Sequence, residues 1–171
     1  MDEITHEDNI KRLIEKIPQD TTPLEKVILA NESTVQTLLS VVFGVPIKIE
    51  VLSQTEAETY IVRWVRLVAD YGNDLAITVC LAESIIDKNN IYEGFLTGIR
   101  EKNMGIGQLL SACGIRTQRE LLGFYSDKNT FSRNYSISTH GYDIKAGRGF
   151  KIIITEVFQK EAFKRLENLN A

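Results

Sequence analysis

One carboxylate falls on the apolar face of a strand-like segment near the end of the sequence. Alternate positions of residues 150–158 put on one face Phe150, Ile152, Ile154, Glu156 and Phe158. Glu156 is therefore predicted to project into an apolar layer, where a lone carboxylate must be paired, hydrogen-bonded or protonated. Glu156 is therefore a candidate residue of a functional site.

A cation shows the same anomaly on an earlier strand-like segment, residues 60–69. Its two faces carry Ile61, Arg63, Val65 and Leu67 on one side, and Val62, Trp64, Arg66 and Val68 on the other. Periodicity alone does not choose between Arg63 and Arg66. An inward arginine offers a rigid fork of donors to a carboxylate. One interpretation is structural: the arginine forms an ion pair with a glutamate in the core, or extends to solvent at the sheet edge. The other is functional: one acid and one cation line a ligand pocket.

Three other parts of the sequence are weaker candidates for a functional site. The turn Met104-Gly105-Ile106-Gly107 could present backbone N–H groups to an anion, or simply let the chain turn between two helices. It lacks the full dinucleotide fingerprint and a preceding strand. Arg119 is a further candidate cation, although solvated charge at a strand start is the alternative. Ser84 has no partnered histidine, so a serine triad is not supported.

The elements that must position these residues follow from the apolar periods. Helices are predicted over residues 10–17, 35–43, 91–99 and 106–113, with a short turn begun by Thr22 and Glu25 and a last helix carrying Phe163, Leu166 and Leu169. Ser33 with Gln36 is read as a capping pair. Strands are predicted over 45–51, 60–69, 75–82, 117–125, 131–139 and 150–158. Hairpin-linked strands interrupted by a helical pair indicate one α+β domain, residues 1–171, with an antiparallel sheet.

Composition narrows the class of function. The 171 residues are 43% hydrophobic and 25% charged, with a net charge of −3. No apolar run reaches eighteen residues and the N-terminus does not read as a signal peptide, so we expect a cytoplasmic protein with no membrane partner. No positive field would attract nucleic acid, so an anionic ligand must be held by particular arginines. Cys80 is expected to be a core residue, and His6 and His140 lack neighbours at zinc-ligand spacing.

The order of several short pieces resembles the chorismate lyase (chorismate–pyruvate lyase) family and its uncharacterised microbial relatives. The pieces are Glu32-Ser33-Thr34, Ile61-Val62-Arg63, Gly105-Ile106-Gly107-Gln108-Leu109-Leu110, Thr117-Gln118-Arg119-Glu120, Arg133-Asn134-Tyr135 and Thr155-Glu156-Val157-Phe158. The match covers roughly residues 24 to 160, nearly the whole chain. The stretch 140–149 looks like a longer hairpin than the family needs.

The resemblance implies a fold, a site and a reaction. The fold would be a six-stranded antiparallel sheet with flanking helices and an enclosed ligand. Arg63 would bind a substrate carboxylate and Glu156 would be the essential acid. Substrate contacts would come from Thr34, Ile106, Gly107 and Arg119. The reaction implied is the conversion of chorismate to 4-hydroxybenzoate and pyruvate, which requires no metal, nucleotide or redox cofactor.

Two other functions compete with this lyase. The same fold resembles the effector-binding domain of certain bacterial transcription regulators, which implies a non-catalytic protein that binds an aromatic acid. A related enzyme could instead release another hydroxybenzoate isomer. In all three cases the expected partner is a small-molecule carboxylate.

Overall fold

The computed structural model describes residues 6–72, 74–139 and 149–169. The helices of this part are α1 (His6–Lys16), α2 (Pro23–Ala30), α3 (Val35–Phe43), α4 (Glu93–Glu101), α5 (Ile106–Ala112) and α6 (Lys160–Leu169). The strands are β1 (Ile47–Glu56), β2 (Tyr60–Asp70), β3 (Ala76–Asp87), β4 (Thr117–Ser126), β5 (Thr130–Thr139) and β6 (Lys151–Gln159).

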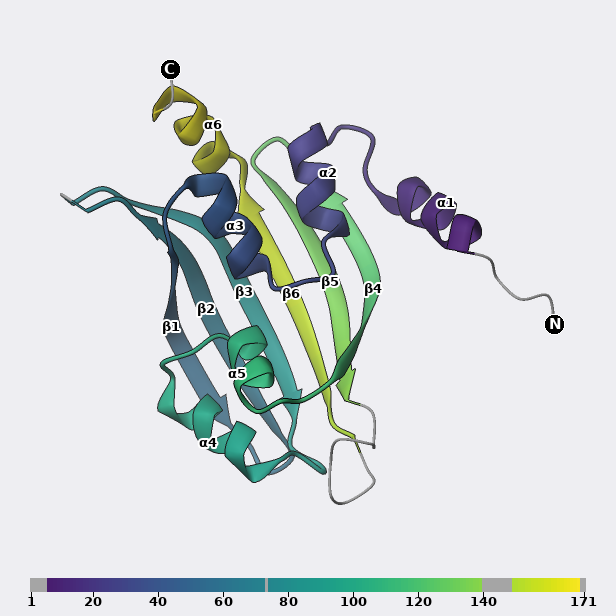
Figure 1. Ribbon diagram of the computed structural model, residues 1–171, viewed down its shortest axis with the longest axis vertical. Coiled ribbons are helices and arrows are strands. Elements are labelled where there is room, and N and C mark those ends of the chain that lie inside the picture. The colour runs from purple at the N-terminus through teal and green to yellow at the C-terminus, as the bar shows by residue number, and fades with distance from the viewer. Residues whose placement is uncertain (1–5, 73, 140–148, 170–171) are drawn as a thin grey trace.

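All six strands form one antiparallel sheet in the order β1-β2-β3-β6-β5-β4. The last strand of the chain thus lies in the middle, between β3 and β5 (Figure 1). The α+β class and the single six-stranded antiparallel sheet expected from the sequence are confirmed.

Helices α2 to α5 lie over the same face of the sheet (Figure 1), and beneath them the buried side chains form two separate clusters. One cluster packs α2, α3 and α6 against one end of the sheet, through residues such as Leu39, Phe131 and Phe163. The other packs α4 and α5 against the opposite end, through residues such as Phe95 and Ile152. Between the two clusters, a part of the covered sheet face belongs to neither of them.

The capping interactions explain where two helices begin and show where a sequence prediction was wrong. At α2 the predicted capping box is present, because Thr22 N–H donates to Glu25 Oε2 at 2.8 Å and Glu25 N–H to Thr22 Oγ1 at 3.3 Å. At α3 the predicted Ser33–Gln36 pair does not form. Thr34 is the N-cap residue, and the Gln36 amide instead donates to the Ile47 carbonyl at 2.7 Å.

Other differences concern the ends of elements. Strand β3 runs five residues beyond the predicted end at Ala82, because alternation continues through Ser84 and Ile86, both buried on the inner face. The apolar stripe predicted for the first helix is only partly covered, since Ile17 is buried but Ile14 is 61% exposed. The predicted hairpin at 140–149 lies, up to residue 148, outside the described residues, as does the Leu169 side chain.

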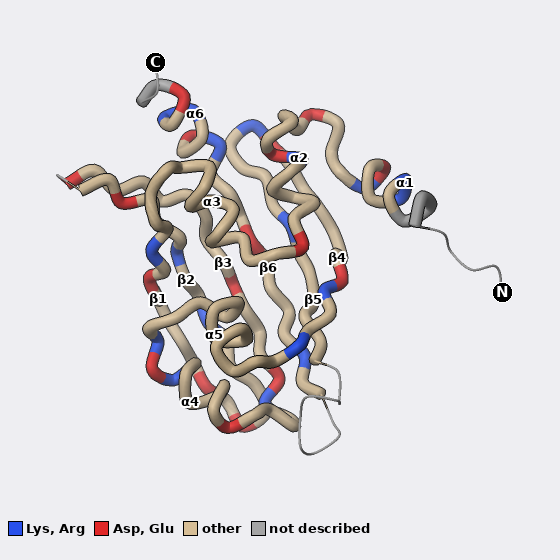
Figure 2. The backbone as a smooth tube through the Cα atoms, viewed as in Figure 1, with Lys and Arg blue, Asp and Glu red and all other residues tan. Residues whose placement is uncertain are grey.

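Charged positions of both signs are interspersed over the molecule (Figure 2), in keeping with the small net charge of −3. Within the described residues, no helix is both long enough and apolar enough to cross a membrane.

Candidate ligand-binding site

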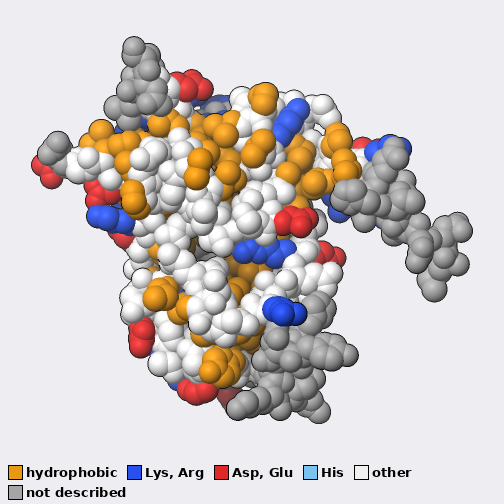
Figure 3. Space-filling model, viewed as in Figure 1, with side chains coloured by type: hydrophobic (Ala, Val, Ile, Leu, Met, Phe, Trp, Pro, Cys, Tyr) orange, Lys and Arg blue, Asp and Glu red, His pale blue; other side chains and the backbone are white. Residues whose placement is uncertain are grey.

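A cavity lies on the covered face of the sheet, between the two hydrophobic clusters. It is bounded by the sheet, by the start of α3 and by the start of α5. The space-filling view is hollowed between these two helices (Figure 3). The space between its walls is about 540 Å³, a volume that includes the open mouth.

All six residues proposed for the site from the sequence line this one cavity. They are Thr34, Arg63, Ile106, Gly107, Arg119 and Glu156. The choice that periodicity left open is settled by burial: Arg63 is 1% exposed, whereas Arg66 lies on the other face and pairs with Glu50 at 2.5 Å in a solvent-exposed contact.

Arg63 is a buried cation with unused donors. Its Nη2 donates to the Met104 carbonyl oxygen at 2.7 Å, while Nε and Nη1 have no hydrogen-bond partner among the described residues. Burial lowers the pKa of this guanidinium below its ordinary value, because the charged form loses hydration. A buried cation satisfied at one nitrogen only is the kind of group that an anionic ligand completes.

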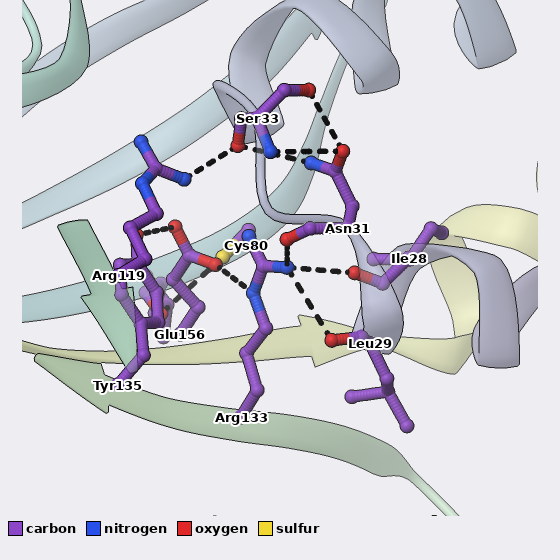
Figure 4. Close-up of polar contacts among 10 residues, drawn as sticks. Ile28, Leu29, Asn31, Ser33, Cys80, Arg119, Arg133, Tyr135 and Glu156 are labelled. Carbon is purple, nitrogen blue, oxygen red and sulfur yellow. Dashed lines mark hydrogen bonds and ion pairs between the residues drawn. The ribbon is translucent and has the colours of Figure 1, made fainter. Parts of the chain in front are cut away.

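Glu156 is also buried, at 4% exposed, but each of its carboxylate oxygens already accepts a hydrogen bond (Figure 4). Arg133 donates from Nε to Glu156 Oε2 at 2.6 Å, and the Tyr135 hydroxyl donates to Oε1 at 3.0 Å. The structural Arg–Glu pair considered from the sequence therefore exists, with Arg133 and not with Arg63 or Arg66. A carboxylate has about four acceptor positions, so Glu156 retains acceptor capacity toward the cavity.

Arg133 is the residue that sequence reasoning missed as part of the site. The signal was present, because Phe131, Arg133 and Tyr135 alternate on the inner face of β5 as Glu156 does on β6. The register pairs Arg133 directly with Glu156, but pairing between distant strands cannot be read from periodicity within one strand.

Arginines from β4 and β5 also hold the segment that joins α2 to α3, residues 31–34. Arg133 Nη1 donates to the carbonyl oxygens of Ile28 at 2.9 Å and of Asn31, and Arg119 Nη1 donates to the Ser33 carbonyl oxygen at 2.5 Å (Figure 4). These bonds fix the backbone that leads into Thr34 and so place Thr34 in the cavity wall.

The ring of Tyr135 packs against both of these arginines. The guanidinium carbons of Arg119 and Arg133 are 5.4 Å and 5.1 Å from its ring centroid, within cation–π range. Burial, and next the charge of Glu156, raise the pKa of Tyr135 well above its ordinary value. Tyr135 is therefore a neutral hydrogen-bond donor at physiological pH.

The glycine turn before α5 has a packing role. The Gly105 N–H already donates to Gln108 Oε1 at 3.0 Å, so it is not a free donor for an anion. A Cβ on Gly105 would lie 2.3 Å from Ile49 Cδ1, and one on Gly107 would lie 3.2 Å from Thr34 Oγ1. The two glycines let α5 approach β1 and the start of α3 closely enough to close one side of the cavity.

The sheet register fixes how Arg63 and Glu156 face the same space. Arg63 on β2 is opposite Ser84 on β3, and Glu156 on β6 is opposite Ala82 on β3. With strands about 4.8 Å apart and a rise of about 3.4 Å per residue, their Cα atoms are about 12 Å apart. The cation and the acid thus approach from two sides of a space whose floor is β3.

Among the described residues there is no group of three or more His, Cys, Asp and Glu side chains suited to hold a metal ion. Cys80 is fully buried, and burial raises the pKa of its thiol well above the ordinary value, as suits the core residue expected from the sequence. The chain matches no protein-family model, and no curated protein matches it significantly.

Proposed function

We propose that the protein is a lyase that converts chorismate to 4-hydroxybenzoate and pyruvate in the cavity described above. The observation that carries this proposal is the buried guanidinium of Arg63, with Nε and Nη1 unpartnered among the described residues, in the same cavity as the carboxylate of Glu156. A ring that bears a carboxylate and a hydroxyl group at opposite ends would satisfy both groups at once.

Each polar group of the substrate finds a partner in this arrangement. Arg63 would bind the ring carboxylate, and Glu156 would accept a hydrogen bond from the ring hydroxyl through its remaining lone pairs. Arg119, which donates a hydrogen bond to the neutral Ser33 carbonyl oxygen, would supply a second positive charge to the side-chain carboxylate. The apolar remainder of the wall would exclude water from the ring.

The reaction needs orientation more than strong acid or base chemistry. The ring carbon that bears the hydroxyl loses its proton, the bond from the neighbouring carbon to the ether oxygen breaks, and the electron pair leaves with the enolpyruvyl group. That group takes up a proton and becomes pyruvate, while the ring becomes aromatic. Aromatisation makes the reaction downhill, so a cavity that holds the substrate in a reactive conformation supplies much of the acceleration. Glu156, next to the ring hydroxyl, would help the departing proton move.

A second candidate function is non-catalytic binding of an aromatic acid. The observation that favours it is the engagement of Glu156 by Arg133 and Tyr135, since a carboxylate held by two donors suits recognition of a hydroxyl group without proton transfer. The binding geometry would be the same in both cases, and only turnover separates them.

The test is to incubate the purified protein with chorismate and to follow 4-hydroxybenzoate by absorbance and pyruvate by a coupled assay. We expect equal amounts of both products from the wild type and from Arg66→Met, a matched arginine on the outer face of β2. Arg63→Met and Glu156→Gln should lose at least 100-fold in kcat/KM. Tight binding of 4-hydroxybenzoate without turnover would favour the binding protein, and neither turnover nor binding would overturn both functions.

A further inference from the structure

The floor of the cavity is built from the smallest inward-facing residues of β3. Ala82 and Ser84 are 5% and 3% exposed, and both line the cavity. Their inward-facing neighbours along the same strand are larger: Val79 and Cys80 on one side, and Ile86 on the other. The cavity therefore exists where β3 carries short side chains.

The register places these two residues between the charged groups. Ser84 is directly opposite Arg63, and Ala82 is directly opposite Glu156. Residues directly opposite on antiparallel strands have β-carbons about 4.5–5.5 Å apart. A ring that reaches from Arg63 to Glu156 must therefore cross over Ala82 and Ser84.

Ser84 is a polar residue with Arg63 directly opposite on β2 and Ile154 directly opposite on β6. Its side chain is buried and lines the cavity beside the base of the Arg63 side chain, so a ligand that lies over Ser84 can accept a hydrogen bond from its hydroxyl.

We propose that Ala82 and Ser84 determine ligand specificity: Ala82 limits how far substituents on the ring can extend toward β3, and Ser84 adds a hydrogen bond to the carboxylate that Arg63 binds. This inference rests on the proposed binding of a small cyclic carboxylate, whether or not turnover follows. It predicts discrimination against ring substituents that project toward β3, and against ligands in which the carboxylate is replaced by an amide.

The test is calorimetric titration of 4-hydroxybenzoate, its carboxamide, and its 3,5-dimethyl derivative. We expect Ser84→Ala to weaken binding of 4-hydroxybenzoate about tenfold or more, the effect of losing one hydrogen bond to a charged group. The carboxamide should be affected much less. The matched control is Ser136→Ala, because Ser136 is equally buried at 3% exposed but points to the other face of the sheet.

Two changes at Ala82 test the size limit in opposite directions. Ala82→Leu should fill the floor and reduce binding of 4-hydroxybenzoate at least 100-fold, with an unchanged or higher Tm. Ala82→Gly, which cannot overfill the site, should improve binding of the dimethyl derivative relative to 4-hydroxybenzoate.

The outcomes separate this inference from the proposed function. If the wild type binds 4-hydroxybenzoate and the Ser84 and Ala82 variants bind all three ligands as it does, the specificity role is overturned and the binding function stands. If the wild type binds none of the three, the specificity role is overturned, and the proposed function is overturned with it only if chorismate is not turned over either.

Discussion

Two buried arginines among the described residues, Arg63 in the cavity wall and Arg133 bonded to Glu156, differ in how their donors are used. Both are 1% exposed. Arg133 pairs with Glu156, donates to backbone carbonyls at the end of α2 and leaves only Nη2 without a partner among the described residues, whereas Arg63 makes one hydrogen bond and leaves both Nε and Nη1 without one. Burial alone therefore does not identify a ligand-binding cation. The number of guanidinium nitrogens without a hydrogen-bond partner distinguishes a structural arginine from a candidate ligand-binding arginine.

The largest effect on stability is expected from replacing Arg133, the arginine that pairs with Glu156. Arg133→Met should lower the free energy of unfolding by about 3–5 kcal/mol, because it leaves the Glu156 carboxylate buried without its cation. Urea denaturation followed by circular dichroism measures this change. Arg66→Met is the control, since an exposed pair contributes only about 0–1 kcal/mol. Equal stability of the two variants would remove the structural role of Arg133.

Replacing Arg63 should have the opposite effect on the free energy of unfolding. Without ligand, Arg63→Met should leave the free energy of unfolding within about 1 kcal/mol of the wild type, or raise it, because an uncompensated buried charge is removed. Saturating 4-hydroxybenzoate should raise the Tm of the wild type and leave that of Arg63→Met unchanged. Thermal unfolding with and without ligand measures both. A variant that unfolds as readily as Arg133→Met would show that Arg63 is structural too.

The smallest effect on stability is expected at the exposed ion-pair cluster of Glu56, Lys88 and Arg100. It provides a comparison with the buried pair of Arg133 and Glu156. Hydrogen bonds from Arg100 and Lys88 lower the pKa of Glu56 from 4.5 to about 2. A carboxyl group with a lowered pKa stabilises the fold above its unfolded-state pKa, so this contribution is present above pH 4.5 and is lost as the pH falls toward 2.

Glu56→Gln should therefore reduce the loss of stability between these two pH values and change little at neutral pH. Urea denaturation at a series of pH values provides the measurement. The control is Glu58→Gln, in the exposed turn between β1 and β2, which should keep the acid dependence of the wild type. An identical pH profile for Glu56→Gln and the wild type would contradict the ion-pair assignment.

Period-two patterning predicted the sheet and the inward direction of Glu156, because one buried face specifies alternation strongly. It did not choose Arg63 over Arg66, since both faces of β2 carry apolar residues and only the position of the helices decides which face is covered. It missed Arg133 as the partner of Glu156, because strand register is a tertiary property. It ended β3 at Ala82, since a cavity-facing Ser84 looks like a strand end when the cavity is unknown.

The strand order has a consequence for the synthesis of the chain. Strands β1 to β3 can pair as they emerge, and β4 with β5 likewise, but these two halves share no strand pairing until β6 enters between them. Each half keeps an unpaired strand edge until then, and such edges attract other chains. A nascent chain that lacks residues 151–159 would thus lack both the junction of the sheet and Glu156. Folding and completion of the cavity therefore become one late event, which makes β6 the segment where slow folding and aggregation compete.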